Sequence, residues 1–222
     1  MRPSFSPLQF ALLVFLVGFL LAFVQIGALT IAFDKLGLSQ SSAFTLLFAS
    51  LIGSMINLPL FSVKASPVDL ETVPAPWREL VRKNQRDFKG KTLIALNVGG
   101  ALIPLLFSVY LMRHNVLHPF DVVLVITIVA AISRVASRPV SGLGVTMPIF
   151  IAPVTAALAA IAIDPQQSAP LAYIGGTLGV LIGADLLRLK DIRKMGAPLA
   201  SIGGAGTFDG IFLTGLVAVL LA

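Results

Sequence analysis

The sequence has no cysteine and only two histidines. Without cysteine the chain can form no disulfide and can hold no metal through thiolates. His114 and His118 lie together in one short polar connection, a position that does not favour a buried metal site. We therefore expect neither a metal ion nor another cofactor.

Charged residues are also scarce, and apolar residues are abundant. Only 12% of the residues are charged, whereas 57% are hydrophobic. These values lie outside the range of soluble domains and predict an integral membrane protein whose main partner is the lipid bilayer. The net charge of +6 would suggest nucleic acid in a soluble protein. In a membrane protein the placement of Lys and Arg reports topology instead, so we expect no nucleic-acid partner.

Long apolar runs recur along the chain, and a helical span needs about 20 mostly apolar residues. The first run continues too far, without a small-residue cleavage site, to be a removable signal peptide. We predict an all-α polytopic transmembrane helical bundle that forms one integral membrane domain over residues 1–222. Its expected spans, about seven, are residues 8–33, 43–63, 92–112, 122–137, 148–163, 171–189 and 205–222.

The segment RVASRPVSGLGVTMP (134–148) separates the fourth run from the fifth. It holds two arginines, two prolines and two glycines. A straight helix cannot continue through such a segment, because proline removes a backbone donor and clashes with the preceding turn.

Positive residues mark the cytoplasmic side of a membrane protein. The connection 64–91 carries seven Lys and Arg residues and 188–194 carries four, whereas 34–42 and 113–121 carry one each. With a cytoplasmic amino terminus and seven crossings of the cell membrane, fourteen of the sixteen basic residues lie inside. In the basic loop 64–91 we expect a short amphipathic helix over residues 77–88. It would lie on the anionic leaflet or bind a cytoplasmic partner.

Two aspartates, Asp185 and Asp209, are predicted to lie at a similar depth in the membrane, near its cytoplasmic face. An ionised carboxylate in the bilayer costs a few kcal/mol or more, so such acids usually face a protein interior or a wet cavity. Two carboxylates that share a proton can divide the work, one as a base on a water and the other as a donor to a carbonyl. Asp185 and Asp209 are therefore the candidate catalytic pair of an intramembrane aspartyl hydrolase.

Other interpretations of these acids stay open. Each could pair with a nearby base, namely Arg188, Arg134 or Arg138. A second alternative is a secondary transporter or an ion- or proton-coupled permease, with an Asp/Arg site at helices broken over residues 137–148 and 196–206. A third is a membrane scaffold without catalytic activity that uses the loop 64–91.

Several polar and glycine residues are candidates for contact with a substrate, either a membrane-embedded peptide or a small molecule. Intramembrane amides contact substrates or form hydrogen bonds between helices. Arginine suits a carboxylate or phosphate, and a glycine-rich helix start directs backbone N–H groups toward an anion. The candidates are Asn57, Asn97, Arg134, Arg138, Gly204 and Gly206.

Glycine has two further patterns. Gly175, Gly179 and Gly183 follow one another at spacing four, which lets helix backbones approach closely. In addition, the segments NVGGALIP (97–104), YIGGTLGV (173–180) and SIGGAGTFDG (201–210) each place Gly-Gly near the start of an apolar run. This second pattern is either a weak internal repeat or the general abundance of glycine in membrane helices.

Five segments together resemble a prokaryotic membrane family known only as domain of unknown function 1614. The resemblance covers nearly all of the chain beyond the first apolar run, and it implies that the Asn, Arg, Gly and Asp positions named above belong to a family pattern. It implies no activity. The segments, in order, are GSMINLPL (53–60), NVGGALIPLLFSVYLM (97–112), SRPVSGLGVTMP (137–148), GGTLGVLIGADLL (175–187) and GAPLASIGGAGTFDGIFLTG (196–215).

A more distant resemblance is to the presenilin and signal-peptide-peptidase group of intramembrane aspartyl proteases. That group also has a cytoplasmic amino terminus and aspartates on its sixth and seventh spans. Its motifs are Tyr-Asp and Gly-x-Gly-Asp, whereas here Ala184 precedes Asp185 and Phe208 precedes Asp209. The Ala-Pro-Leu match at 197–199 also precedes Asp209, while the Pro-Ala-Leu element of the group follows its second aspartate.

Overall fold

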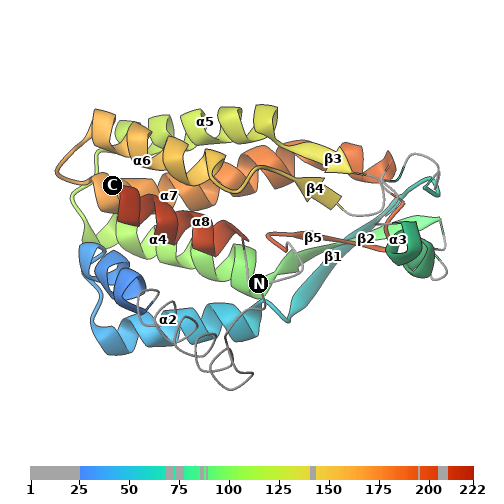
Figure 1. Ribbon diagram of the computed structural model, residues 1–222, viewed down its shortest axis with the longest axis horizontal. Coiled ribbons are helices and arrows are strands. Elements are labelled where there is room, and N and C mark those ends of the chain that lie inside the picture. The colour runs from blue at the N-terminus through green and yellow to red at the C-terminus, as the bar shows by residue number, and fades with distance from the viewer. Residues whose placement is uncertain are drawn as a thin grey trace, which may run out of the picture.

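The computed structural model describes residues 26–68, 73, 78–85, 88, 90–140, 144–194, 196–204 and 210–222. Its largest part is a bundle of helices, and a sheet extends from one end of that bundle (Figure 1). The bundle helices are α4 (Ile103–His114), α5 (Pro119–Ala136), α6 (Ile151–Ile163), α7 (Ser168–Val180) and α8 (Gly210–Leu221).

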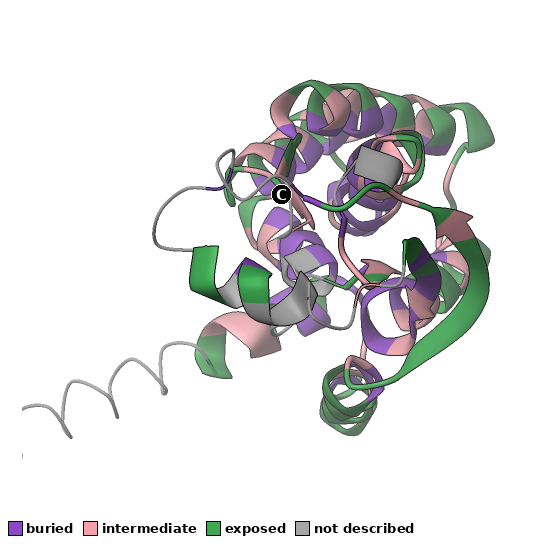
Figure 2. Cartoon of the chain, turned by 90° about the vertical axis from the view of Figure 1, so that its right-hand side faces the viewer, coloured by how far each residue is buried: buried purple, intermediate pink, exposed green. Residues whose placement is uncertain are grey.

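Helix α7 lies at the centre of the bundle and packs against α4, α5, α6 and α8. It continues through the π-helical segment η4 (Leu181–Asp185) and the 3-10 turn η5 (Leu186–Arg188), so that one helix runs over Ser168–Arg188. Buried residues lie where the bundle helices face one another (Figure 2). The core of the protein is therefore centred on α7.

The glycine ridge of this helix packs directly on α5, as its spacing predicts. A Cβ at Gly175 would lie 2.3 Å from Val125 Cγ1, and one at Gly183 would lie 2.3 Å from the backbone oxygen of Ala130. Only glycine leaves room for backbones this close.

Helix α8 packs antiparallel to α7. At one end Ser168 Oγ donates to the carbonyl of Ala222 at 3.3 Å, and in the middle the backbone of Gly215 lies against Gly176. The start of α8 is therefore level with the beginning of η4, short of the C-terminal end of the helix Ser168–Arg188.

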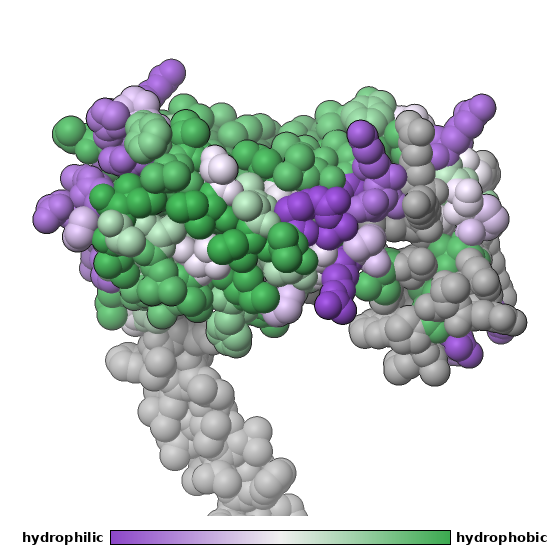
Figure 3. All heavy atoms as spheres, turned by 90° about the horizontal axis from the view of Figure 1, so that it is seen from above, coloured by the Kyte–Doolittle hydropathy of each residue, from purple (hydrophilic) through white to green (hydrophobic). Residues whose placement is uncertain are grey.

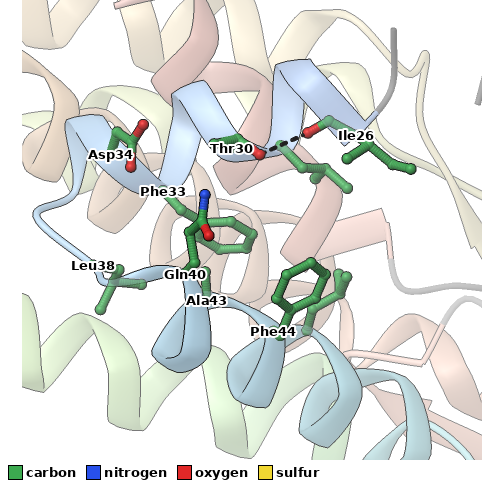
Figure 4. A pocket seen from close by; sticks show the side chains of 10 residues that line it. Ile26, Thr30, Phe33, Asp34, Leu38, Gln40, Ala43 and Phe44 are labelled. Carbon is green, nitrogen blue, oxygen red and sulfur yellow. Dashed lines mark hydrogen bonds between the residues drawn. The ribbon is translucent and has the colours of Figure 1, made fainter. Parts of the chain in front are cut away.

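The helix Ile26–Lys35 and α2 (Gln40–Gly53) meet at a bend of 110°. Ser39 caps α2 by accepting a hydrogen bond from the backbone of Ser42, which stabilises the helix start. Phe33 and Phe44 line an apolar pocket between the two helices (Figure 4). Lys35 Nζ donates to the carbonyl of Val219 at 3.3 Å and thereby ties this bend to the end of α8.

A three-stranded sheet has the order β1–β2–β5, where β1 is Asn57–Lys64, β2 is Lys91–Asn97 and β5 is Leu199–Ile202. Strands β1 and β2 are antiparallel, and β2 and β5 are parallel. Pro59 lies on the edge strand β1 at an irregularity in the register, a position where a strand tolerates proline. Strand β2 runs directly into the π-helical segment η3 (Val98–Leu102), which leads into α4.

The remaining elements are short. A two-stranded sheet of β3 (Arg138–Val140) and β4 (Gly144–Thr146) follows α5, which confirms that no straight helix runs through residues 134–148. Helix α3 (Arg78–Gln85) lies between β1 and β2 in the chain, and the 3-10 turn η6 is Asp191–Lys194. Val81 of α3 is buried with Val68 and Val73, so this side chain contacts protein rather than lipid.

The predicted all-α bundle of about seven spans is wrong. The structure contains two sheets, and the apolar runs 43–63 and 92–112 each combine a helix with a strand of the first sheet. Within the described residues only Pro119–Ala136 and Ser168–Arg188 are individually long and apolar enough to cross a membrane, and the bent pair of helices would make a third. The prediction failed because a hydropathy window registers apolar residues in strands and helices alike.

The surface of the bundle is consistent with membrane association. On the face shown in Figure 3, apolar side chains cover the bundle and hydrophilic ones gather at its two ends. Two to three helices of the described chain have the length and composition of membrane spans. Residues 8–25 of the first predicted span lie outside the described residues.

Candidate functional site

Asp185 ends the π-helical segment η4, and single π-helical turns of this kind are frequent at functional sites. Its Oδ2 accepts a hydrogen bond from the backbone N–H of Gly203 at 2.7 Å. Gly203 follows β5 directly and has a φ of +76°, a left-handed conformation that favours glycine. A Cβ at this position would also lie 2.6 Å from the carbonyl carbon of Gly100. The carboxylate therefore holds the turn after β5 against the start of the η3–α4 helix.

Asn97 occupies the end of β2 and is 4% exposed. Its Oδ1 accepts from the backbone N–H of Gly100 at 2.8 Å, which caps η3. Its Nδ2 donates to the carbonyl of Ser54 at 2.7 Å and to Asn57 Oδ1 at 3.1 Å. Both amide hydrogens are thus used, and the side chain joins α2, β1, β2 and η3 at one point.

Ser201 connects β5 to the same point, because its Oγ donates to Asn57 Oδ1. The backbone N–H of Gly204 donates to the carbonyl of Ser201 at 3.2 Å, and a Cβ at Gly204 would lie only 2.4 Å from Ser201 Oγ. On the far side Ser50 Oγ donates to the carbonyl of Gly99 at 2.8 Å. Four segments distant in the sequence therefore meet where the sheet joins the bundle. We call Asn57, Asn97, Ser201, Gly203 and Asp185 the junction site.

The predicted arginines lie elsewhere, around the end of α5. The guanidinium of Arg188 donates from Nε to Ser137 Oγ at 3.2 Å and from Nη2 to the carbonyls of Arg134, at 2.8 Å, and Ser137. Its Nη1 forms an ion pair with Asp191 at 3.2 Å. Arg188 thereby caps the C-terminal end of α5, where a cation also interacts favourably with the helix dipole. Arg138 begins β3 beside this cap.

The structure thus brings Asn57, Asn97, Gly204 and Asp185 together, with Arg134 and Arg138 at a separate corner. Asp209 and Gly206 lie outside the described residues. Within the described part of the chain, no three His, Asp or Glu side chains come together as a metal ion would need.

Sequence reasoning missed Ser201 and the role of Gly203. One pattern could have indicated them, namely the recurrence of Gly-Gly near polar residues. Two of these pairs, Gly99-Gly100 and Gly203-Gly204, lie in the junction, and a side chain at Gly203 would collide with Gly100. Ser201 lies in the connection between two predicted spans, where a single serine does not stand out in one sequence.

Comparison with known proteins gives a family without an assigned activity. The chain matches no curated protein and no solved structure. Residues 51–221 match the family described as protein of unknown function, DUF1614. This match covers most of the chain, which therefore belongs to that family.

Proposed function

We propose that this protein is a multi-pass protein of the cell membrane and an intramembrane aspartyl hydrolase. Asp185 and Asp209 act together as general acid and base on a membrane-embedded peptide. The observation that carries the proposal is the 2.7 Å hydrogen bond from Gly203 N to Asp185 Oδ2. It ties a half-buried carboxylate near the C-terminal end of the central helix to the segment that leads, six residues later, to the second carboxylate.

The register of the helices supports the pairing of the two acids. Helices α7 and α8 are antiparallel, with Ser168 beside Ala222 and Gly176 beside Gly215. The start of α8 is therefore level with the beginning of η4, the segment that Asp185 ends. Asp209 is bonded covalently to Gly210, the first residue of α8. The sequence position of the second acid is thus compatible with a shared site.

The reaction needs one protonated and one ionised carboxyl group. The ionised group takes a proton from a water molecule while the water oxygen bonds to the peptide carbonyl carbon. The protonated group gives its proton to the carbonyl oxygen, which yields a neutral gem-diol. The C–N bond then breaks, the nitrogen takes a proton from the first carboxyl group, and the second carboxylate regains one from the diol hydroxyl. The products are a carboxylic acid and an amine.

Strand β5 favours a peptide as the substrate. It forms one edge of the sheet, and no strand pairs with its other side among the residues that the structure describes. An extended peptide can add to such an edge through backbone hydrogen bonds. Leu199 of β5 is exposed and could contact an apolar side chain of the peptide. An extended substrate also presents its carbonyl groups, which a helix keeps in its own hydrogen bonds.

The transport alternative relied on helices broken over residues 137–148 and 196–206. The described parts of these segments hold β3, β4 and β5. Transporter sites typically use the ends of two half-helices that face one substrate. Transport is accordingly kept as an outcome of the experiment below.

The test uses the full-length protein in liposomes with a transmembrane peptide as substrate. Asp185→Asn and Asp209→Asn should each lower the cleavage rate by about 10³-fold or more, because the two acids act as one unit. Asp121→Asn, in the first turn of α5 at the other end of the bundle, is the matched control and should cleave normally. Product appearance is followed by mass spectrometry, and thermal melting verifies that each variant is folded.

Three results would reject the proposal. The first is cleavage that persists in either variant. The second is solute or proton flux that both substitutions uncouple while no peptide is cut, which would indicate a transporter. The third is loss of stability in either variant that is restored by removing an arginine partner, which would indicate a structural ion pair.

A further inference from the structure

A cluster of cationic side chains surrounds the C-terminal end of α5. These side chains take no part in the proposed hydrolysis. Arg134 is half-buried on the last turn of α5, Arg138 is exposed at the start of β3, and Lys190 is exposed just after η5. Arg188 holds these segments together through its hydrogen bonds to Arg134 and Ser137. We call Arg134, Arg138, Arg188 and Lys190 the basic corner.

The charges of the basic corner are only partly compensated. The one ion pair within the described residues joins Arg188 to Asp191. In that part of the chain no carboxylate lies within ion-pair distance of Arg134, Arg138 or Lys190. Neighbouring cations at a surface raise the local potential and attract anions.

The basic corner lies where the apolar surface of the bundle ends. Figure 3 shows hydrophilic side chains gathered where α5 leads into β3 and β4, with apolar surface beside them on the bundle. Two apolar side chains next to the cations in sequence also face outward, because Val135 is 84% exposed and Leu187 is 53% exposed. The chain therefore presents exposed cations and exposed apolar side chains in adjacent positions, where the apolar surface of the bundle ends.

We propose that the basic corner binds the headgroup of an anionic phospholipid. Arg134 and Arg138 donate paired hydrogen bonds to the phosphodiester oxygens, a geometry that suits guanidinium groups. Lys190 adds a third positive charge, and the acyl chains lie against Val135 and Leu187. A free phosphate would gain nothing from these apolar side chains, which is why we assign the site to a lipid. The proposal is independent of the hydrolase activity.

The experiment measures lipid retention by native mass spectrometry of the full-length protein, titrated with phosphatidylglycerol or phosphatidylcholine. The double variant Arg134→Gln/Arg138→Gln should bind phosphatidylglycerol more weakly, by about fivefold per removed cation. Its binding of phosphatidylcholine should not change. These substitutions leave the Arg134 carbonyl that Arg188 uses, so the cap of α5 is preserved.

Two further variants keep the result interpretable. Arg113→Gln removes one exposed charge at the opposite end of the bundle and should leave phosphatidylglycerol binding intact. Arg134→Lys/Arg138→Lys keeps both charges and should recover most of the affinity. Thermal melting of each variant without added lipid verifies folding.

The proposal is overturned by any of three outcomes. Wild-type protein could bind both lipids equally, Arg113→Gln could weaken binding as much as the double variant does, or inorganic phosphate could stabilise the protein as much as phosphatidylglycerol. The first would remove the headgroup preference, the second would make the attraction a property of total charge, and the third would assign the corner to a soluble anion.

Discussion

The two longest apolar helices of the bundle, α5 and Ser168–Arg188, have opposite surroundings. In α5, 28% of the most apolar stretch is buried inside the protein, compared with 67% in Ser168–Arg188. Outward-facing residues of α5 are large and aliphatic, such as Val123 and Ile132. The central helix instead carries glycines at its contacts with neighbouring helices.

This difference shows that hydropathy alone does not reveal which apolar helix is enclosed by other helices and which has an outward face. Large aliphatic side chains give a helix favourable contact with acyl chains at no cost in packing. Small residues allow a helix to be surrounded by others, because backbones can then approach within van der Waals contact. The comparison predicts that substitutions on the central helix are far more damaging than matched substitutions on the outer face of α5.

The largest effect should come from Gly183→Leu. A Cβ at Gly183 lies 2.3 Å from a backbone oxygen of α5, so the helices must separate. We expect a loss of about 3 kcal/mol or more in unfolding free energy, at the upper end for overpacking. Val135→Leu, on the exposed face of α5, should change stability little. Equal melting temperatures of both variants in detergent would show that the two helices are not packed as described.

A smaller loss should follow from Arg188→Gln. The Arg188 side chain is 13% exposed, and its guanidinium joins the end of the central helix to the last carbonyls of α5. Hydrogen bonds to charged groups contribute roughly 1.5–3 kcal/mol, so we expect a loss of about 2 kcal/mol. Arg113→Gln, on an exposed side chain, is the control. Chemical denaturation in mixed micelles measures both, and a stable Arg188→Gln protein would contradict the cap.

The smallest expected loss of stability comes from a comparison of Thr177 and Thr127. Each donates a hydrogen bond to the carbonyl four residues earlier in its own helix. Thr177 Oγ1 donates to its own helix at Tyr173 and lies 3.1 Å from Ser108 Oγ of α4. Thr127 on α5 donates only to its own helix, at Val123, and is exposed. Thr177→Val should cost about 0.6 kcal/mol, the average for hydrogen bonds between membrane helices. Thr127→Val should cost less, and a reversed order in thermal melting would contradict the assignment of inner and outer faces.

Parts of this architecture were predictable from local patterns. The runs 122–137 and 171–189 differ from the observed helices by three residues or fewer at each end. The glycine ridge also identified a packing face, since spacing four places its members along one side of a helix. Long apolar helices, and the small residues through which they pack, are defined by residues close together in the sequence. A single sequence is therefore enough to identify them.

The sheet could not be found in the same way. Strand β1 includes Leu58, Leu60 and Phe61, whose hydropathy continues that of α2 without interruption. Strand β2 is paired with β5, more than one hundred residues away, and no local pattern encodes that partner. The amides Asn57 and Asn97 were identified as polar residues of interest, but the sequence did not show that they meet Ser201. Asp209 as the second acid stays a prediction.

The parallel pairing of β2 with β5 also determines the order in which the protein matures. Residues 93–96 of β2 leave the ribosome well before their partners at 199–202, which are made more than one hundred residues later. Contacts between such distant segments form late, because the chain between them must be ordered first. Gly203, which donates to Asp185, directly follows β5 and is made just after it. The junction site can thus be completed only after β5 and Gly203 have been made, and a chain truncated before β5 would lack it altogether.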